Sequence, residues 1–324
     1  MSKYSDPLLD SIATRLDDDD PGVRRVAVMD LVDSHEEEAV ELLIAALADK
    51  DAMVRMEAAK VIDEFDPRDM MDSLVGSLTS EDSNVKNAAA KALADLKDLS
   101  AAPALIAALK SKDTFVLSAI LHALKQMKIK DARPYAIEFL QHDNAAVRRE
   151  AVGVLGYLQD VENLPQLMSV AENDLDPEVR RTAVGTLVYA SPAQVTATLI
   201  TSLGDDNWLV RVEAIKGLGR LKIVDAAERL IAATQDERWQ VQEKAAEAIG
   251  LLSLTEGIPA LGKCLESAIS NLRKAAVAAL GEIADPAGMP LVEKALEDND
   301  PDVRKLARWS QEKINSAFSE VAEN

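Results

Sequence analysis

The sequence predicts an all-α fold, an α-α superhelix built from about ten helix-turn-helix repeats of 31 residues. Three observations lead to this fold class. A motif recurs through the chain at a nearly constant interval, and each copy holds two segments with the apolar spacing of an α-helix. No segment alternates apolar and polar residues as a strand does.

The recurring motif is clearest in "DPEVRRTAVGTL", which starts at Asp176, and "DPDVRKLARWSQ", which starts at Asp300. The two copies lie 124 residues apart, which is four times 31. A valine, replaced once by leucine, marks each repeat: Val23, Val54, Val85, Val116, Val147, Val179, Val210, Val241, Leu272 and Val303. Eight of the nine intervals are 31 residues and one is 32, so we predict that residues 1–324 form a single solenoid.

Each repeat contains two helical segments separated by a short polar turn. The first segment appears in "AVELLIAALADKD" and "AAPALIAALKSKD". Prolines stand near its start, where a missing N–H costs no helix hydrogen bond: Pro103, Pro134, Pro165, Pro259 and Pro290. The second segment follows the marker, and its apolar residues at the marker and four, five and eight places beyond form one stripe on a helix.

The composition favours a core of small and branched side chains. Aromatic residues make up 3% of the chain and apolar residues 48%, so Ala, Leu, Val and Ile must form the core. No run of 18 apolar residues occurs, and the start "MSKYSDPLLDSIATR" lacks the apolar segment of a secretion signal. The lone Cys264 leaves no internal disulfide. We therefore expect a cytoplasmic protein that does not enter a membrane.

Two polar columns flank the marker and predict how neighbouring repeats are joined. Three places before it stand residues that cap helix N-termini: Asp20, Asp51, Asp82, Asp113, Asn144, Asp176, Asn207 and Asp300. One place after it stand basic residues: Arg24, Arg55, Lys86, Arg148, Arg180, Arg211, Arg273 and Arg304. We expect the Asp of one repeat to pair with the Arg of the next, as a ladder that fixes the register of the stack.

The pattern D-x-x-V-R-x-x-A-x-x-x-L resembles the short HEAT-like repeat of the phycobilisome-lyase (PBS lyase) family. The stretches "DDNWLVRVEAIKGLG" and "DERWQVQEKAAEAIG" resemble it most, and the resemblance covers essentially all 324 residues. It implies a right-handed superhelix that grips other proteins, with the second helices on its concave side. Some family members attach or remove bilins on phycobiliproteins, and many are scaffolds or assembly factors.

The exposed columns of the second helices are the candidate binding surface. Positions two and six beyond the marker hold eight Lys or Arg and two Glu, although the chain has a net charge of −20. This face is therefore biased towards positive charge, as either a solvated face or a recognition surface. Among its residues, His122 and Lys216 are candidates for contact with a partner.

Two adjacent repeats carry an Arg-Gly-Tyr set on this face: Arg149, Gly153 and Tyr157, then Arg181, Gly185 and Tyr189. The glycines leave gaps where other repeats have side chains, so the two sets predict a shallow partner-binding pocket. The alternative is ordinary likeness between repeats. Trp208 and Trp239, two places before their markers, are further candidates as partner anchors or as packing residues.

No residue pattern indicates catalysis, a metal or a cofactor. Three His are dispersed and one Cys is present, which disfavours a zinc site. No phosphate-binding loop or nucleophile elbow occurs. The charge of −20 disfavours nucleic acid as a ligand. We expect a non-enzymatic scaffold or assembly factor that grips a partner protein through an acidic or amphipathic segment. The alternative, from the resemblance alone, is a bilin lyase or bilin-handling chaperone.

Overall fold

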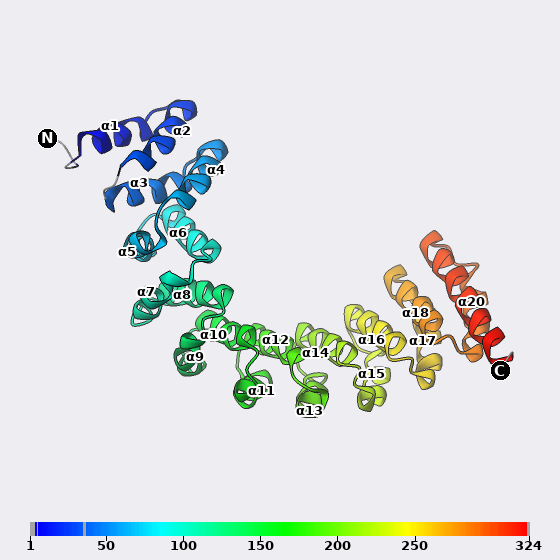
Figure 1. The fold of residues 1–324 in the computed structure, drawn as a ribbon. Coiled ribbons are helices and arrows are strands. Elements are labelled where there is room, and N and C mark those ends of the chain that lie inside the picture. Colours follow the sequence, from blue (N-terminus) through cyan, green and yellow to red (C-terminus); the bar gives the residue numbers. More distant parts are fainter. Residues whose placement is uncertain (1–3, 5, 35–36, 323–324) are drawn as a thin grey trace. The chain divides into compact units, whose positions relative to one another are not determined.

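The computed structural model describes residues 4, 6–34 and 37–322 (Figure 1). Within these residues the regular structure is entirely helical, and it alternates between a first and a second helix in each repeat. The first helices are α1 (Pro7–Leu16), α3 (Glu37–Leu47), α5 (Pro67–Ser77), α7 (Ala102–Ala108), α9 (Arg133–Phe139), α11 (Leu164–Asn173), α13 (Pro192–Ser202), α15 (Ala227–Ala233), α17 (Ile258–Cys264) and α19 (Met289–Ala295). The second helices are α2 (Pro21–Asp30), α4 (Ala52–Val61), α6 (Ser83–Asp95), α8 (Thr114–Met127), α10 (Ala145–Leu158), α12 (Pro177–Thr186), α14 (Trp208–Arg220), α16 (Trp239–Leu251), α18 (Ser270–Ile283) and α20 (Pro301–Ala322). The predicted all-α fold of helix-turn-helix repeats is confirmed.

Short 3-10 turns accompany these helices. They are η1 (Leu31–Asp33), η2 (Ile62–Glu64), η3 (Leu99–Ala101), η4 (Lys130–Ala132), η5 (Val161–Asn163), η6 (Leu187–Tyr189), η7 (Val224–Ala226), η8 (Thr255–Gly257) and η9 (Pro286–Gly288). Most of them lead into a first helix, so the polypeptide already turns helically before the α-helix begins.

The helix boundaries follow the expected chemistry. Asp51 Oδ1 accepts hydrogen bonds from the backbone N–H groups of Met53, at 2.8 Å, and Val54, at 3.4 Å, and so caps α4. Asp113 and Asp176 cap α8 and α12 in the same way. The prolines predicted at helix starts lie in the first turns of α7, α9, α11, α17 and α19.

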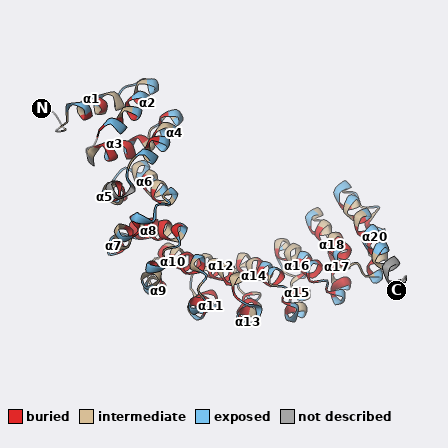
Figure 2. Cartoon of the chain, viewed as in Figure 1, coloured by how far each residue is buried: buried red, intermediate tan, exposed pale blue. Residues whose placement is uncertain are grey.

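The chain divides into two compact units, residues 1–158 and 159–324. In unit 1, α1 to α4 share one core of small and branched apolar side chains that includes Leu9, Val54 and Ala58. In unit 2, the second helices α12, α14, α16, α18 and α20 pack against one another in chain order. Figure 2 shows the buried residues where helices face each other. The repeat pattern runs through both units, and a single continuous solenoid stays a prediction.

Candidate functional site

The exposed face of the second helices carries the candidate residues. Most side chains at positions two and six beyond the marker are exposed or half-buried, as the sequence predicts. The buried exceptions are Gly153 and Val212, of which Val212 is 8% exposed. Since the opposite stripe of each helix lies in the core, this face is available to solvent over most of its length.

In unit 1, the predicted gap at Gly153 is filled. A Cβ atom placed on Gly153 would lie 2.7 Å from Cδ of Lys125, which extends across from α8. The Lys125 Nζ donates to Glu150 Oε2 at 2.8 Å and lies 3.1 Å from His122 Nδ1, which is also 3.1 Å from the same carboxylate oxygen. His122 therefore belongs to a polar cluster between α8 and α10 rather than standing alone.

The other two residues of this set remain accessible. Tyr157 is 46% exposed, and Lys125 Nζ lies 5.9 Å from the centre of its ring. The Arg149 side chain is 45% exposed, and its nearest carboxylate oxygen, on Glu150, is 3.7 Å away. Such a loosely held guanidinium is free to change partners at little cost.

In unit 2, the second set is held more tightly. Arg181 donates to Glu178 on its own helix at 2.7 Å and 3.0 Å. The space beside Gly185 is occupied by Glu213, whose Oε1 would lie 3.3 Å from an added Cβ. The Tyr189 hydroxyl donates to the carbonyl oxygen of Asp160 at 3.1 Å, and burial raises the pKa of this hydroxyl.

The remaining candidates also lie in unit 2. Lys216 is exposed, with its Nζ 3.6 Å from Glu213 Oε2. Trp208 and Trp239 are half-buried at the first positions of α14 and α16, so neither is a fully exposed anchor. Because the two Arg-Gly-Tyr sets belong to different units, a pocket shared between them stays a prediction.

The ladder between repeats exists, but its acceptor was wrongly predicted. Arg180 Nε and Nη2 donate to the two carboxylate oxygens of Asp205 at 2.7 Å and 2.8 Å, and Nη1 donates to the carbonyl of Asp174 at 2.9 Å. Asp205 lies five places before its marker, whereas Asn207, three places before, caps α14. The same pairing joins Arg24 to Asp49, Arg211 to Asp236 and Arg273 to Asp298.

The ladder is interrupted where its acceptor column changes. In unit 1 the position five before the marker becomes Ser80, Ser111 and His142, and the structure shows no Arg-Asp pair at these positions among its described residues. In unit 2 the acceptor position of one repeat holds Ser267. The donor position of the preceding repeat, which would pair with it, holds Gln242. Where the pair is present, the hydrogen bonds from Arg273 hold the pKa of the Asp298 carboxyl below its usual value. The recurring aspartate could have been found in the sequence by aligning the column five before the marker.

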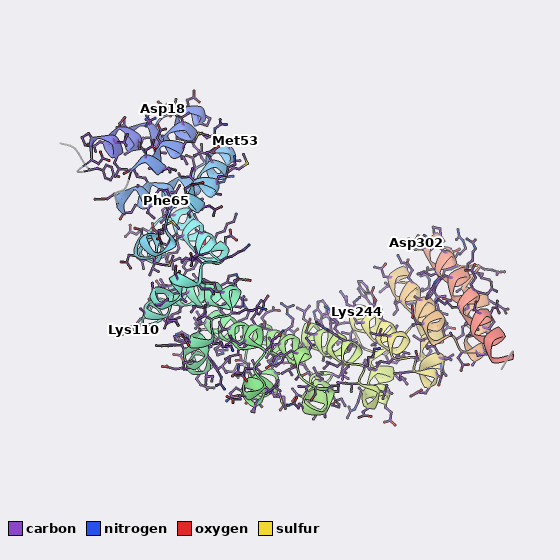
Figure 3. The ribbon with its side chains drawn as sticks, in the orientation of Figure 1. Asp18, Met53, Phe65, Lys110, Lys244 and Asp302 are labelled. Atoms are coloured by element: carbon purple, nitrogen blue, oxygen red, sulfur yellow. The ribbon has the colours of Figure 1, made fainter. Side chains whose placement is uncertain are left out.

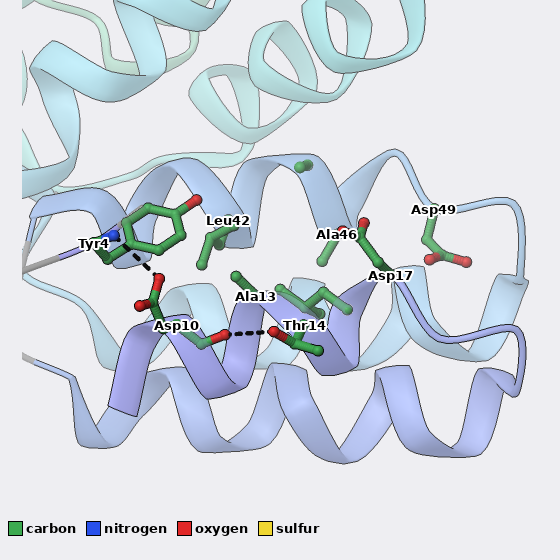
Figure 4. A pocket seen from close by; sticks show the side chains of 10 residues that line it. Tyr4, Asp10, Ala13, Thr14, Asp17, Leu42, Ala46 and Asp49 are labelled. Carbon is green, nitrogen blue, oxygen red and sulfur yellow. Dashed lines mark hydrogen bonds between the residues drawn. The ribbon is translucent and has the colours of Figure 1, made fainter. Parts of the chain in front are cut away.

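A pocket opens in unit 1 between the first helices of the first two repeats (Figure 4). It is lined by side chains of α1 and α3, with Leu42 and Ala46 on one side and Asp10 and Thr14 on the other. Asp10 Oδ1 accepts from the backbone N–H of Tyr4 at 3.1 Å.

Across the described part of the chain, no group of three or more His, Cys, Asp or Glu has an arrangement that would hold a metal ion. No helix among these residues has the length and apolar character needed to cross a membrane.

Cys264, in α17, is expected to be unreactive in the folded protein. It is 3% exposed, and burial raises the pKa of its thiol to about 11. Because the thiolate is the reactive form, we expect a disulfide reagent at pH 8 to label native Cys264 about a hundredfold more slowly than the urea-unfolded chain. The absorbance of the released thiol gives both rates, and equal rates would mean that α17 opens readily.

Comparison with known proteins supports the repeat architecture. A family model for HEAT repeats matches residues 9–94, 47–125, 71–156, 103–174, 164–237 and 227–311. The fold and the family-model matches together place the chain in the class of α-solenoid proteins, which are built from repeated pairs of helices. The chain belongs to the HEAT-repeat family. The match does not distinguish the phycobilisome-lyase branch, and no curated protein matches the chain.

Several solved structures are similar in fold. YibA from E. coli is 19% identical with a TM-score of 0.61, and the alignment covers 75% of this chain and 92% of YibA. Kap95p in a structure with RanGDP is 15% identical with a TM-score of 0.60, covering 95% of this chain and 48% of Kap95p. Kap95 in complex with Nup1 is 15% identical with a TM-score of 0.61, covering 98% and 51%. The chain thus spans about half the length of Kap95, and these likenesses show the fold alone.

Proposed function

We propose that this chain is a non-enzymatic scaffold or assembly factor that binds a partner protein on the exposed face of its second helices. The observation that carries the proposal is the exposure of this face of the second helices within each of the two units, while the opposite stripe is buried. Repeat solenoids bind partners over such extended surfaces. The basic residues on this face, in a chain of charge −20, favour an acidic or amphipathic partner segment.

The test reverses two charges on this face, Arg149→Glu together with Arg181→Glu. Their side chains are 45% and 40% exposed, and neither makes an ion pair with another repeat among the described residues. We expect capture of partners from native cytosol, quantified by mass spectrometry, to fall at least about tenfold. Capture by the wild-type protein should also weaken with salt, since exposed charges are screened over about 8 Å at physiological ionic strength.

A matched control reverses the same number of charges elsewhere, Lys110→Glu with Lys112→Glu. Figure 3 shows Lys110 near the turn that follows α7, away from the second-helix face. This control should capture partners as the wild type does. Unchanged capture by the Arg149 and Arg181 variant, or loss of its helical circular dichroism, would contradict the proposal. The bilin-handling alternative rests on the sequence resemblance, and titration with free bilin, followed by its visible absorption, tests it.

A further inference from the structure

The second helices of the second and third repeats, α4 and α6, are arranged differently from other successive second helices. Within unit 1, α2 packs directly against α4, α6 against α8, and α8 against α10. Within unit 2, each second helix packs directly against the next. Towards the second repeat, however, α6 packs against the first helix α3, and in the described part of unit 1 it forms no such direct pair with α4. The α4–α6 junction is therefore the place within unit 1 where the row of second helices is interrupted.

Burial of the position five beyond the marker shows the same interruption. In most repeats the side chain at this position is at most 1% exposed: Val28, Leu121, Val152, Val184, Ile215, Ala246 and Val277. Ala90 on α6 is half-buried, Arg308 on α20 is exposed, and Ala59 on α4 is exposed as well. The small size of Ala59 does not explain its exposure, because Ala246 is also an alanine and is fully buried. The side of α4 that carries Ala59 thus lacks the cover that this position has in most repeats.

The Arg-Asp ladder is also interrupted at this junction, although its donor is in place. Arg55 Nη1 donates to the carbonyl oxygens of Asp49 and Lys50 at 2.7 Å and 3.0 Å. These are the contacts with its own repeat that Arg180 Nη1 makes in an intact pair. The acceptor position of the next repeat holds Ser80, whose Oγ accepts from the backbone N–H of Asp82 at 3.2 Å. A hydroxyl cannot replace the two oxygens of a carboxylate, so the bidentate link between α4 and the following turn is missing.

The first-helix side of the same junction is packed. The helix α3 packs against both α5 and α6, and Val40 and Ile44 on α3 and Leu74 on α5 are buried. On their other side, α1 to α4 share one core that extends from Leu9 to Val61. The junction is therefore held at its first helices and separated at its second helices. Such an arrangement permits rotation about the packed side, because little buried surface on the open side opposes it.

We propose that the α4–α6 junction is a hinge, about which the body formed by α1 to α4 rotates relative to the body formed by α5 to α10. The pivot is the contact of α3 with α5 and α6, and the connection at residues 62–66 takes up the change in backbone angles. Rotation of α4 towards α6 covers Ala59 and brings Arg55 closer to Ser80, whereas the opposite rotation separates the exposed faces of the two helices. The inference goes beyond the proposed function and does not depend on it, because it concerns the conformation of unit 1 alone.

The first experiment measures distances across the junction. Nitroxide labels on Lys60→Cys in α4 and Lys91→Cys in α6 span the proposed hinge. Labels on Met29→Cys in α2 and Lys60→Cys span the packed α2–α4 junction and are the matched control, since all three positions are exposed and lie six beyond their markers. Every protein also carries Cys264→Ala. We expect double electron–electron resonance to give a distance distribution at least about twofold wider across α4 and α6 than across α2 and α4, because only the first pair spans moving bodies.

A second experiment shifts the hinge in opposite directions. Ala59→Trp places a bulky side chain where α4 would approach α6, so the population at short distance should fall at least about fivefold. Ser80→Asp supplies the carboxylate that Arg55 lacks, so the same population should rise about threefold. Adding Arg55→Gln to Ser80→Asp is the control and should cancel this rise, because glutamine keeps the turn contact, as Gln242 does, but carries no charge. Ala59→Gln takes the place of Ala59→Trp if the latter has lost its helical circular dichroism.

Three outcomes would overturn the inference. Equally narrow distributions at the two junctions would show that α4 and α6 are held at a fixed angle. An equally wide distribution across α2 and α4 would show that α1 to α4 do not move as one body. A rise with Ser80→Asp that persists with Arg55→Gln would show that the closing contact is not the Arg55 pair, and the closed state described here would be wrong. Capture of partners by the Arg149 and Arg181 variant tests the proposed function separately, since neither residue lies at this junction.

Discussion

Replacing Arg180 with alanine is expected to lower the free energy of unfolding by about 3 kcal/mol, because it leaves a buried carboxylate without its partner. The side chains of Arg180 and Asp205 are each 10% exposed, so little water reaches the pair. The substitution also removes the donor to the Asp174 carbonyl, 2.9 Å from Nη1. Urea denaturation followed by circular dichroism measures the loss, and a change below about 0.5 kcal/mol would mean that the pair behaves as an exposed ion pair.

Gln242→Ala is the matched control for this prediction, since Gln242 occupies the same column in the same unit. Its side chain donates one hydrogen bond, to the carbonyl of Asp236 at 2.6 Å, and the acceptor column of the next repeat holds Ser267. We expect a loss of about 1 kcal/mol, the net value of a single hydrogen bond. Similar losses of unfolding free energy in Arg180→Ala and Gln242→Ala would show that the pairing with Asp205 adds no stability beyond that of the hydrogen bond to the turn carbonyl.

Gly250→Ala is expected to lower the free energy of unfolding by about 2 kcal/mol, through overpacking between α16 and α18. The new Cβ would lie 2.7 Å from Cα and 2.9 Å from Cβ of Ala279. Because the nearest obstacle is backbone, the two helices must separate rather than a side chain rotate. This cost exceeds the gain of about 1 kcal/mol in helix propensity that alanine normally brings. Thermal unfolding of the purified variant measures the net effect.

Gly76→Ala is the control for Gly250→Ala, and we expect it not to lower the free energy of unfolding. Gly76 is exposed near the end of α5, and nothing lies within 4 Å of an added Cβ. We expect the free energy of unfolding to stay unchanged or to rise by a few tenths of a kcal/mol, roughly the part of the propensity gain realised near a helix end. Equal effects at Gly76 and Gly250 would contradict the close approach of α16 to α18.

The errors of the sequence analysis lie at contacts between repeats. The ladder was assigned from the sequence to the column three places before the marker, which holds Asn207, whereas Arg180 pairs with Asp205, because the sequence gives no offset between stacked helices. The residue three before the marker accepts from the first backbone N–H groups of its own helix, so it is committed to the cap. The gap at Gly153 was misread for a similar reason, because the side chain that fills it, Lys125, comes from the neighbouring repeat.

The sequence by itself determined the helix-turn-helix repeat, the starts of its helices and the buried stripe of each second helix, since these depend on period, caps and prolines within one repeat. It also predicted that positions two and six beyond the marker face solvent. Only the tertiary structure decided which aspartate Arg180 meets and why Gly250 must lack a side chain. The physical reason is that a repeat period identifies which elements are neighbours, whereas side-chain packing sets the distance and offset at which they meet.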